Sequence, residues 1–128
     1  MRSRYAAFAL GLGPYLVRTL ASGHPDLELP REALLLDLSR ARETKRFLGL
    51  RILHAAETGD LGTVLFFARI FEKGVDQSFA ELSRFSREDG AWRYASGVAF
   101  PKAALPKPVE DLTPRDLEDL EAAAAPEP

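Results

Sequence analysis

Four runs of alternating apolar and polar residues, joined by short connections, constrain this chain more than any other feature. The runs cover approximately Leu48–Thr58, Thr63–Lys73, Ser78–Glu88 and Ala91–Val98. Alternation with a period of two is typical of β-strands. The connections, Gly59–Gly62, Gly74–Gln77 and Asp89–Gly90, are too short for the crossover that parallel strands need. The sequence therefore predicts an antiparallel meander of four strands.

The Asp89–Gly90 pair is the clearest turn signal in the chain. A two-residue hairpin of type I′ needs positive φ at both central residues, which Asp-Gly tolerates well. If these two residues form the loop, Arg87 lies opposite Trp92, Phe85 lies opposite Tyr94 and Ser83 lies opposite Ser96. The same counting, with Gly74–Gln77 as a loop, sets Phe66 against Phe85, Ala68 against Ser83 and Ile70 against Glu81, and a five-residue first loop sets His54 against Phe66.

Helical patterns precede these strands. Tyr5, Phe8 and Leu12 fall on one face of a first helix, and Pro14 begins a short second one. Residues Arg31–Arg46 carry the apolar stripe of a third helix. Helices followed by a meander predict an α+β fold, in which N-terminal helices pack on a curved four-stranded antiparallel sheet.

The chain changes character near residue 100. We assign residues 1–100 to one α+β domain and residues 101–128 to an acidic tail rich in proline and alanine, which holds 3 Lys and Arg residues against 7 Asp and Glu residues. We expect this tail to be disordered. The alternative is a weakly docked helix from Pro114 to about Ala125, capped by Thr113.

Composition excludes several function classes. The chain has no cysteine, which removes disulfides, thiolate catalysis and cysteine-bound zinc, and fits a cytoplasmic protein. Its apolar runs are too short to span a membrane. Residues 1–100 are nearly neutral and show no interleaved basic and aromatic run, so nucleic-acid binding is not expected. His24 is too isolated to indicate a metal site, and no cofactor motif is present.

The predicted register gathers small side chains at the centre of one sheet face. Ile52, Ala68, Ser83 and Ser96 form a row beside an aromatic row of His54, Phe66, Phe85 and Tyr94. Either the first helix fills the resulting space as ordinary core, or a small apolar ligand enters it. The candidate ligand-contacting residues are Arg4, Tyr5, Ala68, Ser83, Phe85, Tyr94 and Ser96.

Glu81 is the leading candidate for chemistry on that face. A carboxylate among apolar side chains must find a cation or become neutral, and Arg4 on the first helix is a suitable partner. Such a pair would fix the helix across the sheet. If Arg4 points away, Glu81 becomes a candidate general base. His54 is the second candidate base, although a structural role is the simpler interpretation.

The opposite face mixes arginine with apolar residues. This mixture is typical of a protein interface, where arginine is enriched. We therefore predict a homodimer through the sheet, with the interface residues Arg51, Phe67, Arg69, Phe71 and Arg84.

Several short blocks, in a fixed order over residues 1–98, resemble the YchJ-like family of SEC-C-motif proteins. The blocks are residues 1–8 (MRSRYAAF), Tyr15-Leu16 with Thr19, Leu48-Gly49-Leu50, Phe66-Phe67-Ala68-Arg69, Glu81 with Ser83-Arg84-Phe85, and residues 87–92 (REDGAW). The resemblance implies a fold like nuclear transport factor two, a cystatin-like cone of curved sheet and helices that is often dimeric through the sheet. Members usually carry a cysteine-rich segment, which this sequence lacks.

This resemblance implies a fold and no particular reaction. The leading hypothesis is a non-enzymatic ligand-binding or protein-interaction module. The alternative is a small proton-transfer enzyme, an isomerase, dehydratase or cyclase, with Glu81 or His54 as the base in the cone.

Overall fold

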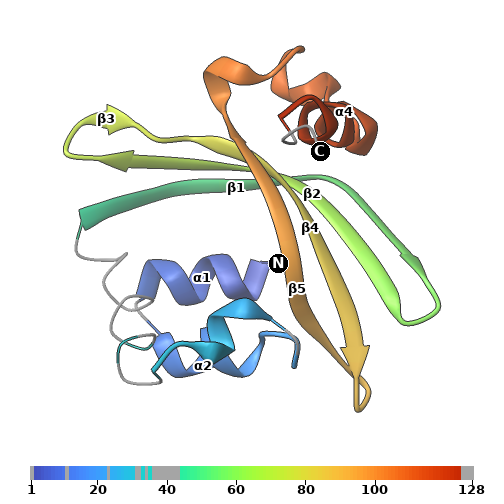
Figure 1. The fold of residues 1–128 in the computed structure, drawn as a ribbon. Coiled ribbons are helices and arrows are strands. Elements are labelled where there is room, and N and C mark those ends of the chain that lie inside the picture. The colour runs from blue at the N-terminus through green and yellow to red at the C-terminus, as the bar shows by residue number, and fades with distance from the viewer. Residues whose placement is uncertain are drawn as a thin grey trace.

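A curved antiparallel sheet separates two groups of helices (Figure 1). The computed structural model describes residues 2–10, 12–22, 24–30, 33, 35 and 44–124. The concave side holds α1 (Arg2–Leu10) and α2 (Gly13–Arg18), followed by the 3₁₀ turn η1 (Pro25–Glu28). The convex side holds α4 (Pro114–Ala124). This arrangement confirms the predicted α+β class with N-terminal helices on a curved sheet.

The sheet has the strand order β1-β2-β4-β5, with a short β3 attached to β2. Its strands are β1 (Lys45–Thr58), β2 (Leu61–Glu72), β3 (Val75–Asp76), β4 (Phe79–Glu88) and β5 (Ala91–Pro101). All pairs are antiparallel. The third helix predicted over residues 31–46 falls largely outside the described residues, and its last two positions, Lys45 and Arg46, belong to β1.

The Asp89–Gly90 turn is confirmed. Both residues have positive φ, 51° and 78°, as a type I′ hairpin requires, and Arg87 pairs with Trp92. A β-bulge follows on β5. Phe85 pairs with Tyr94, but Arg84 pairs with Ser96, so Ala95 is an extra residue. The predicted Ser83–Ser96 pair is therefore wrong, and Ser83 lies opposite Gly97.

A second tight turn changes the register between β2 and β4. The expected loop at Gly74–Gln77 is wrong, because Lys73 and Gly74 form a two-residue turn with φ of 51° and 78° and β3 pairs back onto β2. This turn moves β4 four residues along β2. Phe66 consequently lies opposite Glu81 instead of Phe85, and Ala68 lies opposite Phe79 instead of Ser83.

Two bulges also alter the pairing of β1 with β2. Ile52 pairs with Phe66, and His54 pairs with Leu65, so the predicted pairing of His54 with Phe66 is wrong. The row of small side chains expected from the turns does not form. A space on the concave face nevertheless exists, and different residues enclose it.

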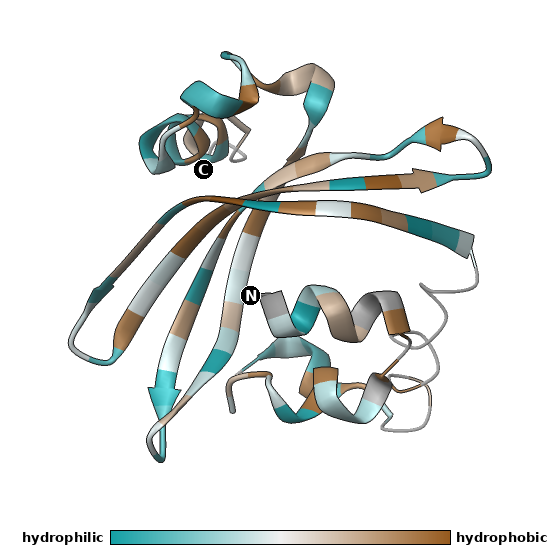
Figure 2. Ribbon diagram, turned by 180° about the vertical axis from the view of Figure 1, so that it is seen from behind, coloured by the Kyte–Doolittle hydropathy of each residue, from teal (hydrophilic) through white to brown (hydrophobic). Residues whose placement is uncertain are grey.

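Residues 102–124 pack on the convex face instead of remaining disordered. Leu112 and Leu117 are buried against Leu65, Phe67 and Leu82 of the sheet. The remaining apolar residues of this contact are Ala80, Leu53, Val98, Phe100, Leu105 and Val109. Figure 2 shows hydrophobic bands on the strands where the sheet passes between the two groups of helices. The convex face of the sheet is apolar, and burying it beneath the C-terminal segment removes that apolar surface from water.

The start of α4 carries a reciprocal cap. The Asp116 carboxylate accepts hydrogen bonds from the Thr113 backbone N–H at 2.9 Å and from the Thr113 hydroxyl at 3.1 Å, and Lys107 lies 3.2 Å from the same carboxylate. In return, the Thr113 hydroxyl oxygen accepts the Asp116 backbone N–H at 3.4 Å. Backbone N–H groups at a helix start lack partners within the helix, so this cap stabilises the start of α4. On the surface, Arg84 of β4 forms an ion pair with Glu121 at 3.1 Å.

Candidate functional site

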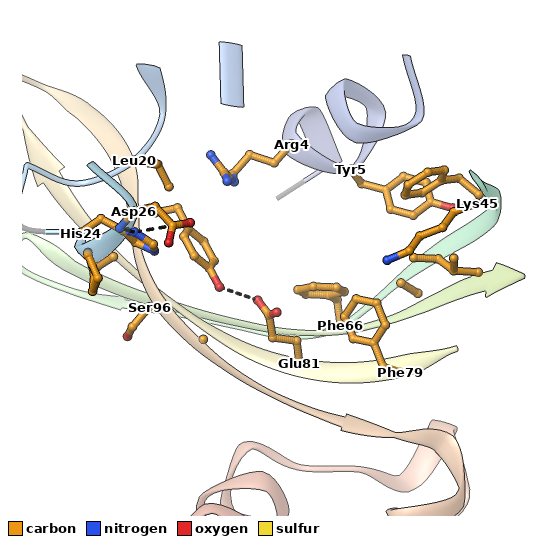
Figure 3. A pocket seen from close by; sticks show the side chains of 17 residues that line it. Arg4, Tyr5, Leu20, His24, Asp26, Lys45, Phe66, Phe79, Glu81 and Ser96 are labelled. Atoms are coloured by element: carbon orange, nitrogen blue, oxygen red, sulfur yellow. Dashed lines mark hydrogen bonds and ion pairs between the residues drawn. The ribbon is translucent and has the colours of Figure 1, made fainter. Parts of the chain in front are cut away.

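A cavity of about 570 Å³ lies between the concave face of the sheet and the N-terminal segments (Figure 3). Alternation along β2 supplies part of its floor, because Phe66, Ala68 and Ile70 all project to the concave face. Its other lining residues are Arg4, Tyr5, Leu20, His24, Pro25, Asp26, Lys45, Phe47, Phe79, Glu81, Tyr94, Ala95, Ser96 and Gly97. The wall is therefore mostly apolar and aromatic, with a few polar groups that converge on it.

Glu81 is the acidic centre of the cavity. Its Oε2 atom accepts a hydrogen bond from the Tyr94 hydroxyl at 3.1 Å and another from the Ser83 hydroxyl. Ser83 is fully buried beneath the cavity and does not line it. Both bonds end on Oε2, and no described residue bonds Oε1. One carboxylate oxygen thus remains available as an acceptor.

Gly97 makes room for this arrangement. It pairs with Ser83 on the neighbouring strand. A Cβ atom on residue 97 would lie 2.6 Å from Glu81 Oε2 and closer still to the Tyr94 hydroxyl oxygen. Real Cβ atoms do not approach other atoms so closely. The missing side chain is therefore a requirement of the Glu81–Tyr94 hydrogen bond.

The backbone around Tyr94 is fixed from the helical side. Tyr94 donates its backbone N–H to the Thr19 carbonyl at 2.6 Å, and its own carbonyl accepts from Ala21 at 2.7 Å. These bonds make a short parallel bridge at Leu20, just after α2. The segment after α2 is thereby attached to β5 beside the bulge at Ala95, which positions the Tyr94 ring in the cavity.

Arg4 is buried, with 6% of its surface exposed. Its guanidinium donates to the Leu16 carbonyl at 2.9 Å and to the Thr19 hydroxyl, and lies 4.8 Å from the centre of the Tyr94 ring. Tyr94 therefore contacts both Arg4 and Glu81. Burial lowers the pKa of Arg4, while the nearby Tyr94 and Glu81 raise it. Arginine stays protonated despite such shifts, so Arg4 contributes a positive charge to the site.

Burial also raises the pKa of Tyr94 above its ordinary value of 10.0, and the charge and hydrogen bond of Glu81 raise it further. The physical reason is that a phenolate would be poorly solvated here and would face a carboxylate. Tyr94 therefore keeps its proton and remains the donor to Glu81 across the ordinary pH range.

Tyr5 and Phe47 form an aromatic part of the cavity wall. The Tyr5 ring meets Phe47 edge to face at 5.5 Å between centroids, and the Tyr5 hydroxyl accepts the Gly49 backbone N–H at 2.9 Å. Burial raises the pKa of Tyr5, and the bond from Gly49 opposes that shift. Phe66 and Phe79 make a similar edge-to-face pair at 6.0 Å. Such contacts hold the rings in place as a defined surface.

His24 and Asp26 lie at the rim, where the sequence analysis expected no site. His24 Nδ1 accepts the Asp26 backbone N–H at 3.1 Å and begins the 3₁₀ turn at Pro25. The His24 ring lies 5.7 Å from the Tyr94 ring. A His-Pro-Asp sequence does signal a capped turn, but nothing in the sequence places that turn over the sheet. Lys45 was missed because it was assigned to a helix.

The structure brings most of the proposed ligand-contacting residues together. Arg4, Tyr5, Ala68, Tyr94 and Ser96 line the cavity with Glu81. Ser83 and Phe85 of that set, and the candidate base His54, do not line the cavity. Phe85 contacts Tyr94 but lines a separate hollow of about 380 Å³ near Gly62 and Trp92. His54 is exposed on β1 and lines neither hollow.

The predicted interface face is partly covered by the chain itself. Phe67 has only 8% of its surface exposed because it packs beneath the C-terminal segment, and Arg84 pairs with Glu121. Arg51 and Arg69 are exposed, and Phe71 is half-buried.

The described ranges hold neither a metal-binding cluster nor a membrane-spanning helix. No three or more His, Cys, Asp or Glu side chains there are grouped to hold a metal ion. No helix within those same ranges has the length and hydrophobicity needed to cross a membrane.

Residues 1–97 match the family model described as YchJ, middle NTF2-like domain. The chain belongs to this family. A UPF0225 protein from Chromobacterium violaceum is 42% identical to the YchJ-like chain over 101 residues, which cover 77% of this chain and 70% of the relative. The solution structure of a SEC-C-motif-containing protein from Rhodopseudomonas palustris superposes with a TM-score of 0.65 at 38% identity, covering 78% of this chain and 75% of that one.

These comparisons confirm the resemblance drawn from the sequence blocks and the cone-like fold that it implied. The family model ends at residue 97, before the C-terminal segment that covers the convex face. The cavity lining lies entirely within the matched residues.

Proposed function

We propose that this YchJ-like protein is a non-enzymatic binding module that holds a small organic molecule in its concave-face cavity. The observation that carries the proposal is the cavity itself, about 570 Å³ in volume and lined by aromatic side chains with a few convergent polar groups. Known small-molecule sites have volumes of about 300–1,000 Å³ and this same mixture of walls.

The alternative of an ordinary filled core is less well supported. Tyr5 and Phe66 border the space without closing it. Glu81 in a filled apolar core would also need its full set of partners, whereas Oε1 has no bond from a described residue. A ligand that supplies the missing contact accounts for both features.

A proton-transfer enzyme remains the second candidate, because Glu81 lines the cavity and its Oε1 has no bond from a described residue, as a general base requires. Isomerase, dehydratase and cyclase chemistry would all need such a base. His54 drops out of this proposal because it lies outside the cavity. The two hydrogen bonds at Glu81 Oε2 favour a fixed acceptor over a proton carrier, which is why we place binding first.

The test is a screen of small aromatic fragments by nuclear magnetic resonance on ¹⁵N-labelled protein. We expect binders to shift the amide signals of Ala68 and Gly97. The variant Ala68→Leu adds a side chain to the cavity floor and should remove these shifts. Ala56→Leu makes the same change at the second hollow and should leave them intact.

Fragments that shift only signals around Gly62 and Trp92 would contradict the proposal, as would shifts that survive Ala68→Leu. Turnover of a bound fragment that is lost in Glu81→Gln would instead favour the enzyme.

The predicted homodimer stays a proposal, and the structure changes how it is tested. Phe67→Glu would disrupt packing within the chain, so it cannot report on an interface alone. Arg51→Glu with Arg69→Glu alters only exposed side chains of that face. We expect light scattering to show a dimer that this double variant weakens. A folded variant with an unchanged mass would argue against an interface at these arginines.

A further inference from the structure

We infer that the cavity takes a neutral aromatic molecule that donates one hydrogen bond to Glu81 Oε1. This inference rests on the proposed binding function and adds the chemical class of the ligand. It follows from three properties of the lining: its balance of charges, its unused hydrogen-bonding groups and the arrangement of its rings.

The charges of the cavity already balance. Arg4 and Lys45 are its cations, and Glu81 and Asp26 are its anions. His24 Nδ1 accepts the Asp26 backbone N–H at 3.1 Å and lies 3.9 Å from the Asp26 carboxylate, so these two residues contact each other within the chain. A charged ligand would leave one charge uncompensated in a partly enclosed space, and such a charge is costly. The balance therefore favours a neutral molecule.

The hydrogen-bonding groups without a partner decide whether the ligand donates or accepts. Glu81 has one oxygen without a bond from a described residue, and a carboxylate is an acceptor only. Ser83 and Tyr94 hold the other oxygen, so the carboxylate has a fixed direction. Across the cavity, Tyr5 already accepts from Gly49, which leaves its own proton for a second contact. An O–H or N–H group on the ligand satisfies Glu81 directly.

The shape of the apolar wall favours a ring. Phe47, Phe66 and Phe79 line the cavity together with Tyr5, and these aromatic groups meet one another edge to face. Figure 3 shows Phe66, Phe79 and Tyr5 grouped beside Glu81. Aromatic molecules pack well against such surfaces through stacked and edge-to-face contacts. An aromatic alcohol or a related N–H compound fits all three properties.

Calorimetric titration of the wild-type protein with three matched probes tests this class. 2-Naphthol is neutral and carries a donor, 2-methoxynaphthalene is neutral without one, and (2-naphthylmethyl)ammonium is a cation. We expect 2-naphthol to bind about tenfold more tightly than 2-methoxynaphthalene, because the ether leaves the Glu81 acceptor unpaired. We expect a similar preference over (2-naphthylmethyl)ammonium, because its charge would be uncompensated in the cavity.

Glu81→Gln provides a second test that reverses the polarity. Its amide oxygen takes over the bonds from Tyr94 and Ser83, so the amide NH₂ faces the cavity as a donor. We expect the preference for 2-naphthol over 2-methoxynaphthalene to fall to about one or to invert. Glu57→Gln removes a carboxylate outside this cavity, beside Arg87, and should keep the wild-type preference.

The outcomes separate the two proposals. If all three probes bind equally, or if the cation binds best, the ligand class is wrong while the binding function stands. If 2-naphthol keeps its preference in a folded Glu81→Gln protein, Glu81 is not the acceptor. If no probe binds the wild-type cavity, the proposed function fails as well.

Discussion

Replacing Gly97 by alanine should break the Glu81–Tyr94 hydrogen bond without touching either partner. A Cβ at this position would lie 2.6 Å from Glu81 Oε2, 2.8 Å from its carboxyl carbon and closer still to the Tyr94 hydroxyl. The Tyr94 backbone is bonded to Thr19 and Ala21, and its ring packs between Arg4, His24 and Phe85, so it has little freedom to retreat. The carboxylate must therefore move away.

The expected cost follows from two opposing effects. Hydrogen bonds to charged groups contribute about 1.5–3 kcal/mol to stability. Replacing glycine by alanine recovers about 0.4–1 kcal/mol, because the unfolded chain loses conformational freedom. We therefore expect Gly97→Ala to lower the free energy of unfolding by about 1–2 kcal/mol.

Urea denaturation followed by circular dichroism measures this cost, and Gly49→Ala is the matched control. Gly49 also lies in a strand, but a Cβ there meets nothing within 4 Å, so we expect no loss of stability. Alkaline titration of tyrosine absorbance supplies a second readout, because the pKa of Tyr94 should fall once Glu81 no longer faces it. Equal stability of the two variants, with an unchanged titration, would refute the reasoning.

Three further predictions concern α4 and the titrating groups. Leu117→Ala removes a fully buried side chain and should lower the free energy of unfolding in urea by about 2–5 kcal/mol. The control Leu61→Ala alters a side chain that is 67% exposed and should change stability by less than about 0.5 kcal/mol. Equal costs for the two variants would mean that α4 is not docked. The Thr113 N–H lowers the pKa of Asp116, so that carboxylate stabilises the fold above the ordinary value of 3.8 and loses its effect as pH falls through the lowered value. Asp116→Asn should thus be less stable than wild type at pH 7 and equal to it in acid, and a pH-independent difference would contradict this cause. The raised pKa of Tyr94 stabilises the fold fully below pH 10.0 and less as pH rises further, so alkaline unfolding should be less steep in Tyr94→Phe.

The strands could be predicted from the sequence because alternation and turn residues are local signals. Alternation located four of them, and Asp89–Gly90 fixed its hairpin correctly. The Lys73–Gly74 turn was missed because lysine rarely adopts positive φ, so the pair carries no strong signal. One missed turn then displaced every predicted pair between β2 and β4.

Glu81 was selected for a sound reason, although its surroundings were misjudged. A carboxylate among apolar neighbours does need partners, and it has them in Tyr94 and Ser83. The bulge at Ala95 and the absent side chain of Gly97 create that contact, and neither is visible in a pattern of hydrophobicity. His24 was missed because a loop residue reaches the cavity only through tertiary structure, and Lys45 was missed because it was assigned to a helix although it begins β1.

The tail illustrates a limit of composition. Its acidic and proline-rich character resembles that of disordered segments, yet Leu112 and Leu117 are enough to bury it against a sheet face that is itself apolar. Only the structure shows that the convex face of the sheet offers these two leucines an apolar surface on which to pack.

The alternation along β2 has a consequence for how this chain tolerates insertions. Leu65 and Phe67 face the C-terminal helix, while Phe66 and Ala68 face the cavity. Adding or deleting one residue within this strand would exchange the two sets, filling the cavity with large side chains and leaving the helix without its contacts. Length changes during evolution or engineering should therefore be confined to the turns at Gly59–Asp60 and Lys73–Gly74, where the chain reverses outside both cores.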